Sequence, residues 1–336
     1  MKKHILSVCA AALATLPLSA KEAKQEYPAP SEIVAKAEAA EWVAIAPSDL
    51  MVMELTPDAK GKARRVVIQL MPAPFSQGWV GNIRKLAAAK FWDGTSVNRV
   101  QDNYVVQWGD ATEKKALPDG LAVVPENEYA HFIGEKRSAQ LEKQGKKFSD
   151  WEIKRIGEEN TPPRKGSIPR YVEGLKTYAF YDFFETGWPI AVNGADYEKW
   201  PIHCYGMVGV GRNLSPDTGT GAELYTVIGH APRHLDRNIA LVGRVIEGIE
   251  HLSSLPRGTG GLGFYESEAE RTPIVSVRIG SDAADLPAFE YLSTESASFA
   301  AYADARANRR DPFFNVPAGG ADICNIPVPV RRKAVP

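Results

Sequence analysis

The chain has 336 residues, of which 24% are charged and 44% are hydrophobic, and this ordinary globular composition excludes a disordered or fibrous protein. Lysine and arginine number 40 against 41 aspartate and glutamate, so the formal net charge is only −1. A chain without an excess of basic residues lacks the electrostatic footprint of a nucleic-acid-binding protein, and we expect no nucleic acid among its partners.

The first twenty residues have the layout of a secretory signal. Lys2 and Lys3 precede an apolar run over residues 5–18, and two small residues follow at Ser19-Ala20. The run is too short to span a bilayer, and no later stretch is apolar enough to be a membrane anchor. We therefore expect a signal peptide over residues 1–20, no membrane span, and a mature protein that is periplasmic or secreted.

Two cysteines, Cys204 and Cys324, would remain after removal of the signal. A disulfide between them could persist in an oxidising compartment. The sequence does not give the distance between their Cα atoms, which decides whether a bond can form. A disulfide and two buried free thiols therefore both stay open.

Residues 21–49 form a predicted N-terminal extension. A polar, proline-containing arm over residues 21–30 leads to Ser31, which can cap a helix. With Glu32 in the first turn and alanine-rich turns behind it, this helix is predicted to run through Trp42.

From residue 50 onward the pattern becomes β-rich. Short runs of β-forming residues over 50–55 and 65–70 flank a turn-forming stretch, so they predict a hairpin. Apolar residues at helical spacing predict a helix over 78–90, ended by a turn at 92–94. Residues 96–107 are again typical of a strand.

The stretch from about 113 to 200 differs in character. It contains charged pieces at 135–147 and 151–156 that are typical of helices, and an aromatic cluster that could be the core of this segment. We interpret the stretch as a partly helical insertion in one domain; the alternative is a separate small domain. The aromatic cluster is Tyr178, Phe180, Tyr181, Phe183, Phe184 and Trp188.

Strand-like runs return after Tyr205. A helix is predicted around 245–255, and the C-terminal extension over 281–336 is loop-like apart from a possible helix around 298–309. The predicted strands of this part are 207–210, 223–228, 239–245 and a closing strand at 273–279.

Two short motifs suggest metal or cofactor chemistry only superficially. His230 and His234 are four residues apart, but Pro232 between them disfavours a helix and the glutamate of H-E-x-x-H is absent. Residues 258–263 fit G-x-G-x-x-G, yet no strand precedes them and no apolar helical face follows. We therefore predict no metal and no cofactor, and a loop at 258–263.

The segment 91–110, FWDGTSVNRVQDNYVVQWGD, resembles the signature of cyclophilin-type peptidyl-prolyl cis/trans isomerases. In that family a Y-D-G-T turn leads to F-H-R-V and then to F-M-I-Q-G-G-D. Later landmarks of the family, P-N-T, S-Q-F-F, W-L-D and F-G-K-V-x-E-G, have counterparts in the same order at 216–218, 222–225, 234–236 and 242–248. The resemblance covers roughly 50–112 and 204–280.

This resemblance implies a mainly β fold: a closed eight-stranded antiparallel barrel capped by two helices. The barrel domain would span residues 50–280 and be interrupted by the insertion at about 113–200. The family binds X-Pro segments in a groove on the outer face of the barrel and isomerises the X-Pro bond. Proline-containing segments of exported proteins are therefore the expected partners.

Arg99 matches the catalytic arginine of the family. An arginine in a strand is by itself usually a surface or ion-pair residue, so only its frame supports this role. Tyr104 and Val105 stand where the family has Phe and Met under the proline ring, and Gln107 where a Gln hydrogen-bonds the substrate backbone. Tyr225 matches a further wall of the proline pocket, and Leu235 does so as well.

The facing half of the implied groove departs from the family. Glu223 replaces a Gln, which adds a charge and removes a donor. His234 replaces a Trp, and Ile239 a His sometimes found at the rim. Either Arg212 or Asn213 could contact the peptide, because their loop is one residue longer than in the family.

Two functions from different classes remain. As an enzyme, the protein would accelerate X-Pro isomerisation in folding exported proteins. As a binding module, it would be a non-catalytic or weakly catalytic chaperone or assembly factor that holds proline-containing segments. Arg99 and Gln107 favour the first function, whereas Glu223, Ile239 and the large insertion favour the second.

Overall fold

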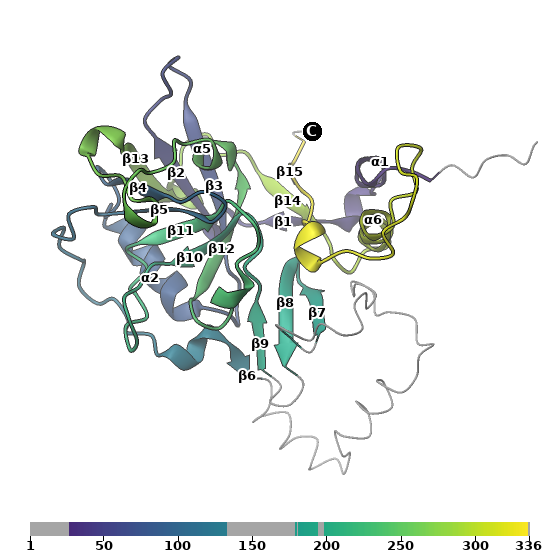
Figure 1. Cartoon of the computed structure of the whole chain (residues 1–336), viewed down its shortest axis with the longest axis horizontal. Helices are drawn as coiled ribbons and strands as arrows, with labels where there is room; N and C mark the ends of the chain where they lie inside the picture. The colour runs from purple at the N-terminus through teal and green to yellow at the C-terminus, as the bar shows by residue number, and fades with distance from the viewer. Residues whose placement is uncertain (1–26, 133–178, 180, 194–197, 335–336) are drawn as a thin grey trace, which may run out of the picture.

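Eight strands close into an antiparallel barrel in the computed structural model, which describes residues 27–132, 179, 181–193 and 198–334. The strands follow one another around the barrel in the order β10-β11-β5-β4-β13-β2-β3-β12 (Figure 1). This confirms the predicted mainly β fold. The barrel strands are β2 (Leu50–Leu55), β3 (Arg64–Leu70), β4 (Ser96–Val100), β5 (Val105–Gly109), β10 (Met207–Val210), β11 (Leu224–Val227), β12 (Leu241–Glu247) and β13 (Thr272–Ile279).

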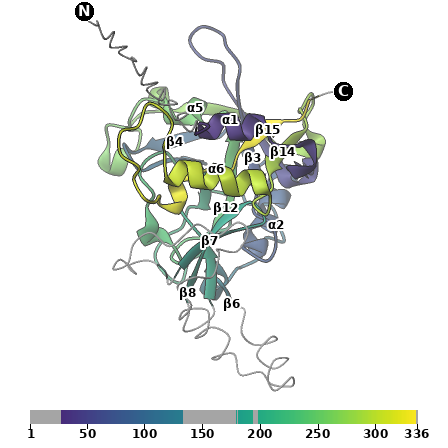
Figure 2. The same cartoon turned by 90° about the vertical axis from the view of Figure 1, so that its right-hand side faces the viewer.

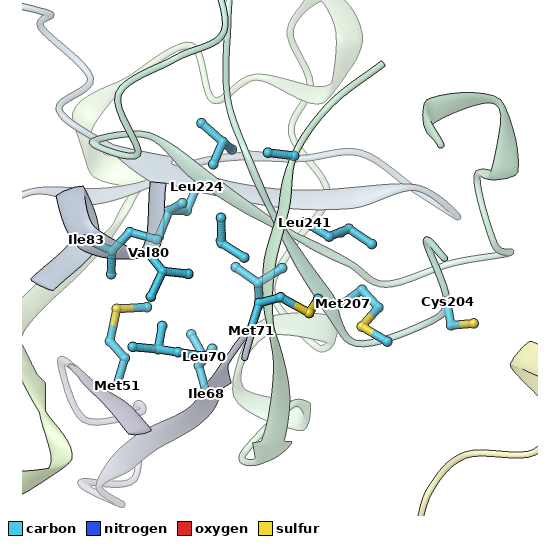
Figure 3. Packing of buried hydrophobic residues seen from close by; sticks show 14 of the residues in the cluster. Met51, Ile68, Leu70, Met71, Val80, Ile83, Cys204, Met207, Leu224 and Leu241 are labelled. Atoms are coloured by element: carbon cyan, nitrogen blue, oxygen red, sulfur yellow. The ribbon is translucent and has the colours of Figure 1, made fainter. Parts of the chain in front are cut away.

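The barrel interior and two helices share one apolar core. α2 (Gln77–Ala88) buries Trp79, Val80, Ile83 and Leu86 in it, and α5 (Glu250–Ser253) buries Leu252. Figure 3 shows Val80 and Ile83 of α2 beside Met51 of β2 and Leu224 of β11. Each such aliphatic or aromatic side chain contributes about 1.5–3 kcal/mol when it leaves water. The helix at 245–255 was predicted too long, because β12 continues to Glu247.

A β-bulge interrupts the pairing of β4 with β5. Val97 lies opposite Trp108 and Arg99 lies opposite Gln107, so Asn98 is an extra residue on β4. The extra residue lets Val97 face the core while Arg99 lies on the outer side. The single strand-like stretch predicted at 96–107 is therefore wrong, since a turn also separates Val100 from Val105.

The side chain of Asn98 replaces the ladder hydrogen bond that the bulge removes. Its Nδ2 donates to the carbonyl of Gly109 at 3.1 Å, and its Oδ1 accepts from the hydroxyl of Ser96 at 2.7 Å. Because Asn98 is buried and its amide is paired on both sides, the bulge is a defined structural feature.

Both chain extensions belong to one three-stranded sheet outside the barrel. β1 (Trp42–Ile45) pairs with β14 (Phe289–Leu292), which pairs with β15 (Val330–Arg332). α1 (Pro30–Ala35) and α6 (Ala297–Ala307) lie side by side beyond this sheet (Figure 2).

Two predictions for the extensions are therefore wrong. The N-terminal helix ends at Ala35, because the chain from Trp42 onward is extended and pairs with β14. The C-terminal extension contains β14 and β15 in addition to α6, the helix predicted around 298–309.

The described part of the insertion forms a second, four-stranded sheet in the order β6-β9-β8-β7. Its strands are β6 (His131–Phe132), β7 (Tyr181–Glu185), β8 (Trp188–Asn193) and β9 (Glu198–Pro201). The predicted helical pieces at 135–147 and 151–156 lie outside the described residues, as do the signal at 1–20, Tyr178 and Phe180.

Two aromatic side chains of this sheet pack against the rest of the protein. Phe184 contacts Phe299 of α6, with ring centroids 5.0 Å apart, and Trp188 is buried in the main core. These two rings therefore differ from the prediction, because they pack against residues outside the insertion, whereas Tyr178, Phe180 and the side chain of Tyr181 lie outside what the structure describes.

Arg244 of β12 joins the barrel, the insertion and the terminal sheet. Its guanidinium donates to Gln69 Oε1 at 2.8 and 3.0 Å and to the carbonyl of Gly187 at 2.7 Å. The ring centroids of Trp188 and Tyr291 lie 4.5 and 5.8 Å from its Cζ. Burial lowers the pKa of Arg244 to about 10, so it remains charged at neutral pH.

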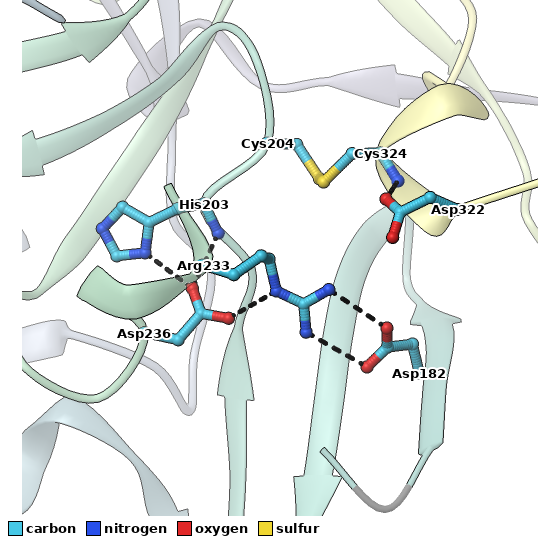
Figure 4. The surroundings of a disulfide bond; sticks show 7 residues. All are labelled: Asp182, His203, Cys204, Arg233, Asp236, Asp322 and Cys324. Carbon is cyan, nitrogen blue, oxygen red and sulfur yellow. Dashed lines mark hydrogen bonds and ion pairs between the residues drawn. A yellow bond between two sulfur atoms is a disulfide. The ribbon is translucent and has the colours of Figure 1, made fainter. Parts of the chain in front are cut away.

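A disulfide connects the barrel to the C-terminal extension. Cys204 and Cys324 are bonded, with their Cα atoms 5.0 Å apart (Figure 4), so the structure selects one of the two states that the sequence leaves open. Cys324 lies in a short 3-10 helix. The 3-10 helices are η1 (Ala39–Glu41), η2 (Pro47–Asp49), η3 (Glu126–Tyr129), η4 (Arg233–Leu235), η5 (Gly261–Gly263), η6 (Glu268–Glu270), η7 (Gly280–Asp282) and η8 (Ile323–Asn325).

Within the described ranges, no helix is both long and apolar enough to cross a membrane.

Replacing Arg244 tests the junction of the three parts. Arg244→Met keeps an apolar stem but leaves Gln69 Oε1 and the carbonyl of Gly187 without their donor, so we expect a loss of about 3 kcal/mol in the free energy of unfolding. Urea unfolding measures it. In the control, Arg65→Met, the half-exposed pair with Glu54 is lost, and the expected cost is below about 1 kcal/mol. Equal effects of the two substitutions would contradict this role of Arg244.

Candidate active site

Arg99 lies on the outer side of β4, and neighbouring groups fix its guanidinium. Nε donates to the carbonyl of Leu262 at 2.7 Å, and Nη1 donates to Gln107 Oε1 at 3.0 Å. Nη2 donates to Gln101 Oε1. These contacts come from the turn after β4, from β5 and from the loop before β13, and together they hold the guanidinium in one orientation.

Two aromatic rings lie beside the same guanidinium. The Cζ of Arg99 is 5.7 Å from the ring centroid of Tyr104 and 5.2 Å from that of Phe264, both within the range of cation–π attraction. Burial lowers the pKa of Arg99 below its ordinary value, and the neighbouring Tyr104 and Glu223 act in the opposite direction. The side chain stays protonated at neutral pH.

An apolar cluster lies next to Arg99 on the outside of the barrel. Val106 and Trp108 of β5 belong to the barrel core, and because side chains alternate along a strand, Val105 and Gln107 face outward. Val105 packs with Tyr225 and Val227 of β11. Three partly buried side chains complete the cluster: Tyr104, Leu235 and Ile239.

Tyr225, the buried tyrosine of the cluster, is held at both its ring and its hydroxyl. It lies opposite Gly209 of β10, where any Cβ would overlap the phenol. Its hydroxyl is 2.8 Å from His203 Nε2, and His203 Nδ1 is 2.8 Å from Asp236. Since a carboxylate only accepts, Nδ1 donates to Asp236, and Nε2 shares a hydrogen bond with the Tyr225 hydroxyl.

The polar contacts continue from Asp236 to the insertion (Figure 4). Arg233 Nε donates to Asp236 Oδ2 at 2.7 Å, and its two Nη atoms lie 3.2 and 3.4 Å from the carboxylate of Asp182 on β7. Burial raises the pKa of Asp236, but hydrogen bonds from His203 and Arg233 outweigh it and hold the pKa below its ordinary 3.8. Asp236 is therefore ionised at neutral pH.

Gln107 links Arg99 to Glu223. Its Oε1 accepts from Arg99, and its amide donates to the Glu223 carboxylate. Burial raises the pKa of Glu223 above its ordinary 4.5, while the bond from Gln107 opposes that rise. The carboxylate thus orients the amide so that its oxygen faces Arg99.

The remaining predicted contact residues lie in different surroundings. Arg212 donates from Nε and Nη2 to the carbonyl of Asn238, at 3.0 and 2.8 Å. Asn213 is exposed, and its backbone N–H donates to Asp217. The ring of His234 stacks on that of Tyr104, with centroids 6.2 Å apart. Arg212 therefore supports the loop around Asn238.

The structure gathers most of the predicted site residues and adds others that the sequence analysis missed. The gathered residues are Arg99, Tyr104, Val105, Gln107, Glu223, Tyr225 and Leu235. The sequence analysis missed Phe264, which flanks Arg99, and four residues that support Tyr225: His203, Gly209, Arg233 and Asp236. Of these five, only Asp236 lies in a motif that the sequence analysis quoted, because it ends the landmark at 234–236.

Among the described residues, no group of three or more His, Cys, Asp and Glu side chains is arranged to hold a metal ion.

The fold and the site are those of one class of protein: a closed barrel with a fixed arginine beside an apolar cluster on its outer side. The sequence pattern of the family described as cyclophilin type peptidyl-prolyl cis-trans isomerase/CLD matches residues 59–280, which is more than half of the chain. The chain therefore belongs to this family and is a peptidyl-prolyl cis-trans isomerase of the cyclophilin type.

One solved structure shows the same fold. The chain is similar to the crystal structure of cyclophilin AquaCyp293 from Hirschia baltica, with a TM-score of 0.59 and 22% identity over 88% of this chain and 95% of that one. A cyclophilin type isomerase of Cryptosporidium parvum, crystallised in the presence of the dipeptide Ala-Pro, covers 68% of this chain and 98% of its own at 10% identity. Its TM-score of 0.35 is too low to compare the folds. No curated protein matches the chain.

The link from Glu223 through Gln107 to Arg99 predicts an acid-sensitive activity. As the pH falls through the raised pKa of Glu223, the carboxylate becomes neutral and its bond from Gln107 weakens, because charge-assisted bonds are the stronger kind. We expect kcat/KM for an X-Pro peptide to fall by about three- to tenfold below that pKa. In Glu223→Gln an amide oxygen accepts at every pH, so its profile should be flat. Matching profiles for the two proteins would contradict the link.

Proposed function

We propose that Arg99 accelerates X-Pro isomerisation by donating hydrogen bonds to the twisted imide. The observation that carries this proposal is the fixed guanidinium of Arg99 next to the outer cluster of Val105, Tyr225 and Leu235. A proline ring packed on that cluster would bring its imide nitrogen close to Arg99.

The chemistry needs only a donor in the right place. An X-Pro bond rotates over a barrier of about 18–20 kcal/mol, because rotation destroys the resonance of the amide. In the twisted transition state the proline nitrogen becomes pyramidal and regains a lone pair. A donor aimed at this nitrogen binds the transition state more tightly than the planar ground state, which is the condition for catalysis.

Arg99 has enough N–H donors for this task. A guanidinium has five N–H groups, and within the described part of the chain three of them donate, to Leu262, Gln107 and Gln101. The other two can serve a substrate, one at the imide nitrogen and one at a carbonyl. Shortening a step of tens of seconds to milliseconds requires about 5–7 kcal/mol, which fixed charged donors beside an apolar surface can supply.

We further propose that the protein works outside the cytoplasm on proline-containing segments of exported proteins. The signal-like layout of residues 1–20 supports this location. The disulfide between Cys204 and Cys324 supports it independently, because such bonds persist in oxidising compartments and are rare in the cytosol.

Substitution of Arg99 tests the catalytic proposal. Arg99→Ala should lower kcat/KM for an Ala-Pro peptide by about 10²–10³-fold, the range for loss of a transition-state donor. Arg99→Lys keeps the positive charge but lacks the planar guanidinium, so its kcat/KM should lie between those of the wild-type protein and Arg99→Ala. The matched control is Arg65→Ala, because β3 lies across the barrel from β5. Isomerase activity that is unchanged in Arg99→Ala would refute the mechanism.

Mass spectrometry tests the proposed location. The chain is expressed in a Gram-negative host, and the periplasmic fraction is denatured and alkylated without a reductant. We expect a chain that begins at Lys21 and carries no label at Cys204 or Cys324. Both cysteines should become labelled once the protein is reduced. A chain that is confined to the cytoplasm and retains residues 1–20 with both thiols labelled would contradict export.

A further inference from the structure

The loop over residues 256–265 covers the edge of β4 beyond the point where β4 pairs with β13. β13 pairs with β4 only at Ser96 and Val97. Beyond that point the N–H of Gly258 donates to the carbonyl of Val100 at 3.0 Å, and the N–H of Tyr265 donates to that of Asn98 at 2.9 Å. The loop therefore stands directly beside Arg99.

Contacts within and around the loop hold it in one conformation. The hydroxyl of Tyr265 donates to the carbonyl of Pro256 at 2.6 Å, and Arg257 pairs with Asp102 at 2.9 Å. Gly263 has a φ of +80°, and a Cβ there would lie 2.7 Å from the Cα of Gln101. Only glycine fits such a position without strain, so the loop is built to pack closely on β4.

This fixed loop exposes two large apolar side chains next to the guanidinium. Phe264 is 39% exposed and its ring centroid lies 5.2 Å from the Cζ of Arg99. Leu262 is 69% exposed and has a φ of +56°, a left-handed conformation that is strained for leucine. Strained backbone and exposed apolar surface are both features that cluster at binding sites.

The composition of the loop indicates what it would bind. Residues 258–265 carry no charged side chain, so they offer nothing to attract an acidic or basic group. The Phe264 ring lies 5.2 Å from the Cζ of Arg99, and an extended chain advances about 3.3–3.6 Å per residue, so a peptide with its imide at Arg99 would have its flanking residues within reach of the loop. The substrate side chain that contacts the loop therefore belongs to a residue close to the X-Pro bond in sequence.

We propose that Phe264 and Leu262 form an apolar subsite for a large apolar side chain adjacent to the X-Pro bond of the substrate. The inference rests on the proposed function and narrows its substrates to proline segments flanked by residues such as Leu or Phe. The ring of Phe264 contacts Arg99 directly, whereas Leu262 contacts it only through its backbone carbonyl, so replacing the Leu262 side chain gives the cleaner test of the subsite.

The test measures isomerisation of short peptides by NMR exchange spectroscopy. This avoids a coupled protease, whose own preference for apolar residues would obscure the result. The peptides contain a central Ala-Pro in a Gly and Ala background, with Leu or Phe placed in turn at each of the flanking positions. We expect one flanking position at which Leu or Phe raises kcat/KM over Gly by about three- to tenfold.

Three variants assign that preference to the loop. Leu262→Asn has a similar size and tolerates a positive φ, and Leu262→Gly removes the side chain without strain. Both should reduce the Leu/Gly ratio of kcat/KM to about one- to twofold, and Phe264→Ser should do the same. The matched control is Val123→Asn at another exposed apolar residue, 96% exposed, which should keep the wild-type ratio.

The outcomes separate this inference from the proposed function. Equal kcat/KM for all peptides with the wild-type protein would overturn the subsite alone. A preference for Leu that persists in both Leu262 variants and in Phe264→Ser would also overturn it. No isomerisation of any peptide, the Ala-Ala-Pro-Ala member included, would instead contradict the proposed function.

Discussion

The β-bulge at Asn98 is the constraint on which the position of Arg99, and therefore the site, depends. Without the extra residue, β4 could not keep Val97 and Val100 in the core and still present Arg99 opposite Gln107 on the outer side. The other edge of β4 pairs with the loop before β13, whose carbonyl at Leu262 fixes the guanidinium. The inserted residue thus turns the proposed catalytic group outward, and the neighbouring loop holds it there.

The additions to the barrel are joined to it by buried polar groups. Arg244 connects β12 to the turn of the insertion hairpin, and Arg233 connects Asp236 to Asp182 of the insertion. Asp236 in turn orients His203, which holds the hydroxyl of Tyr225. Because buried charges are stable only when fully paired, these contacts fix the insertion relative to the outer cluster.

The elements that the sequence predicted well are those whose signals are local. The hairpin of β2 and β3, the helix α2 and the strands β10 and β11 follow from periodicity and turn residues within short windows. The grouping of Arg99, Tyr104, Gln107 and Tyr225 follows from the family resemblance, whose motifs lie in two compact blocks.

The elements that were missed depend on distant partners. Trp42 extends a helical pattern locally, yet it begins a strand because Leu292 lies opposite it. Asn98 gives no sign of a bulge, since only its pairing with β5 reveals the extra residue. His203 and Phe264 belong to no quoted motif, and they reach the site only through the closure of the barrel and the docking of the loop on β4.

The most direct test of the account is a crystal structure of the protein with a bound Ala-Pro-containing peptide. The account predicts the proline ring against Val105, Tyr225 and Leu235, with the two remaining N–H groups of Arg99 facing the imide nitrogen and a neighbouring carbonyl. A peptide bound elsewhere on the barrel, or a proline ring on this cluster with the guanidinium of Arg99 turned away from the imide, would contradict it.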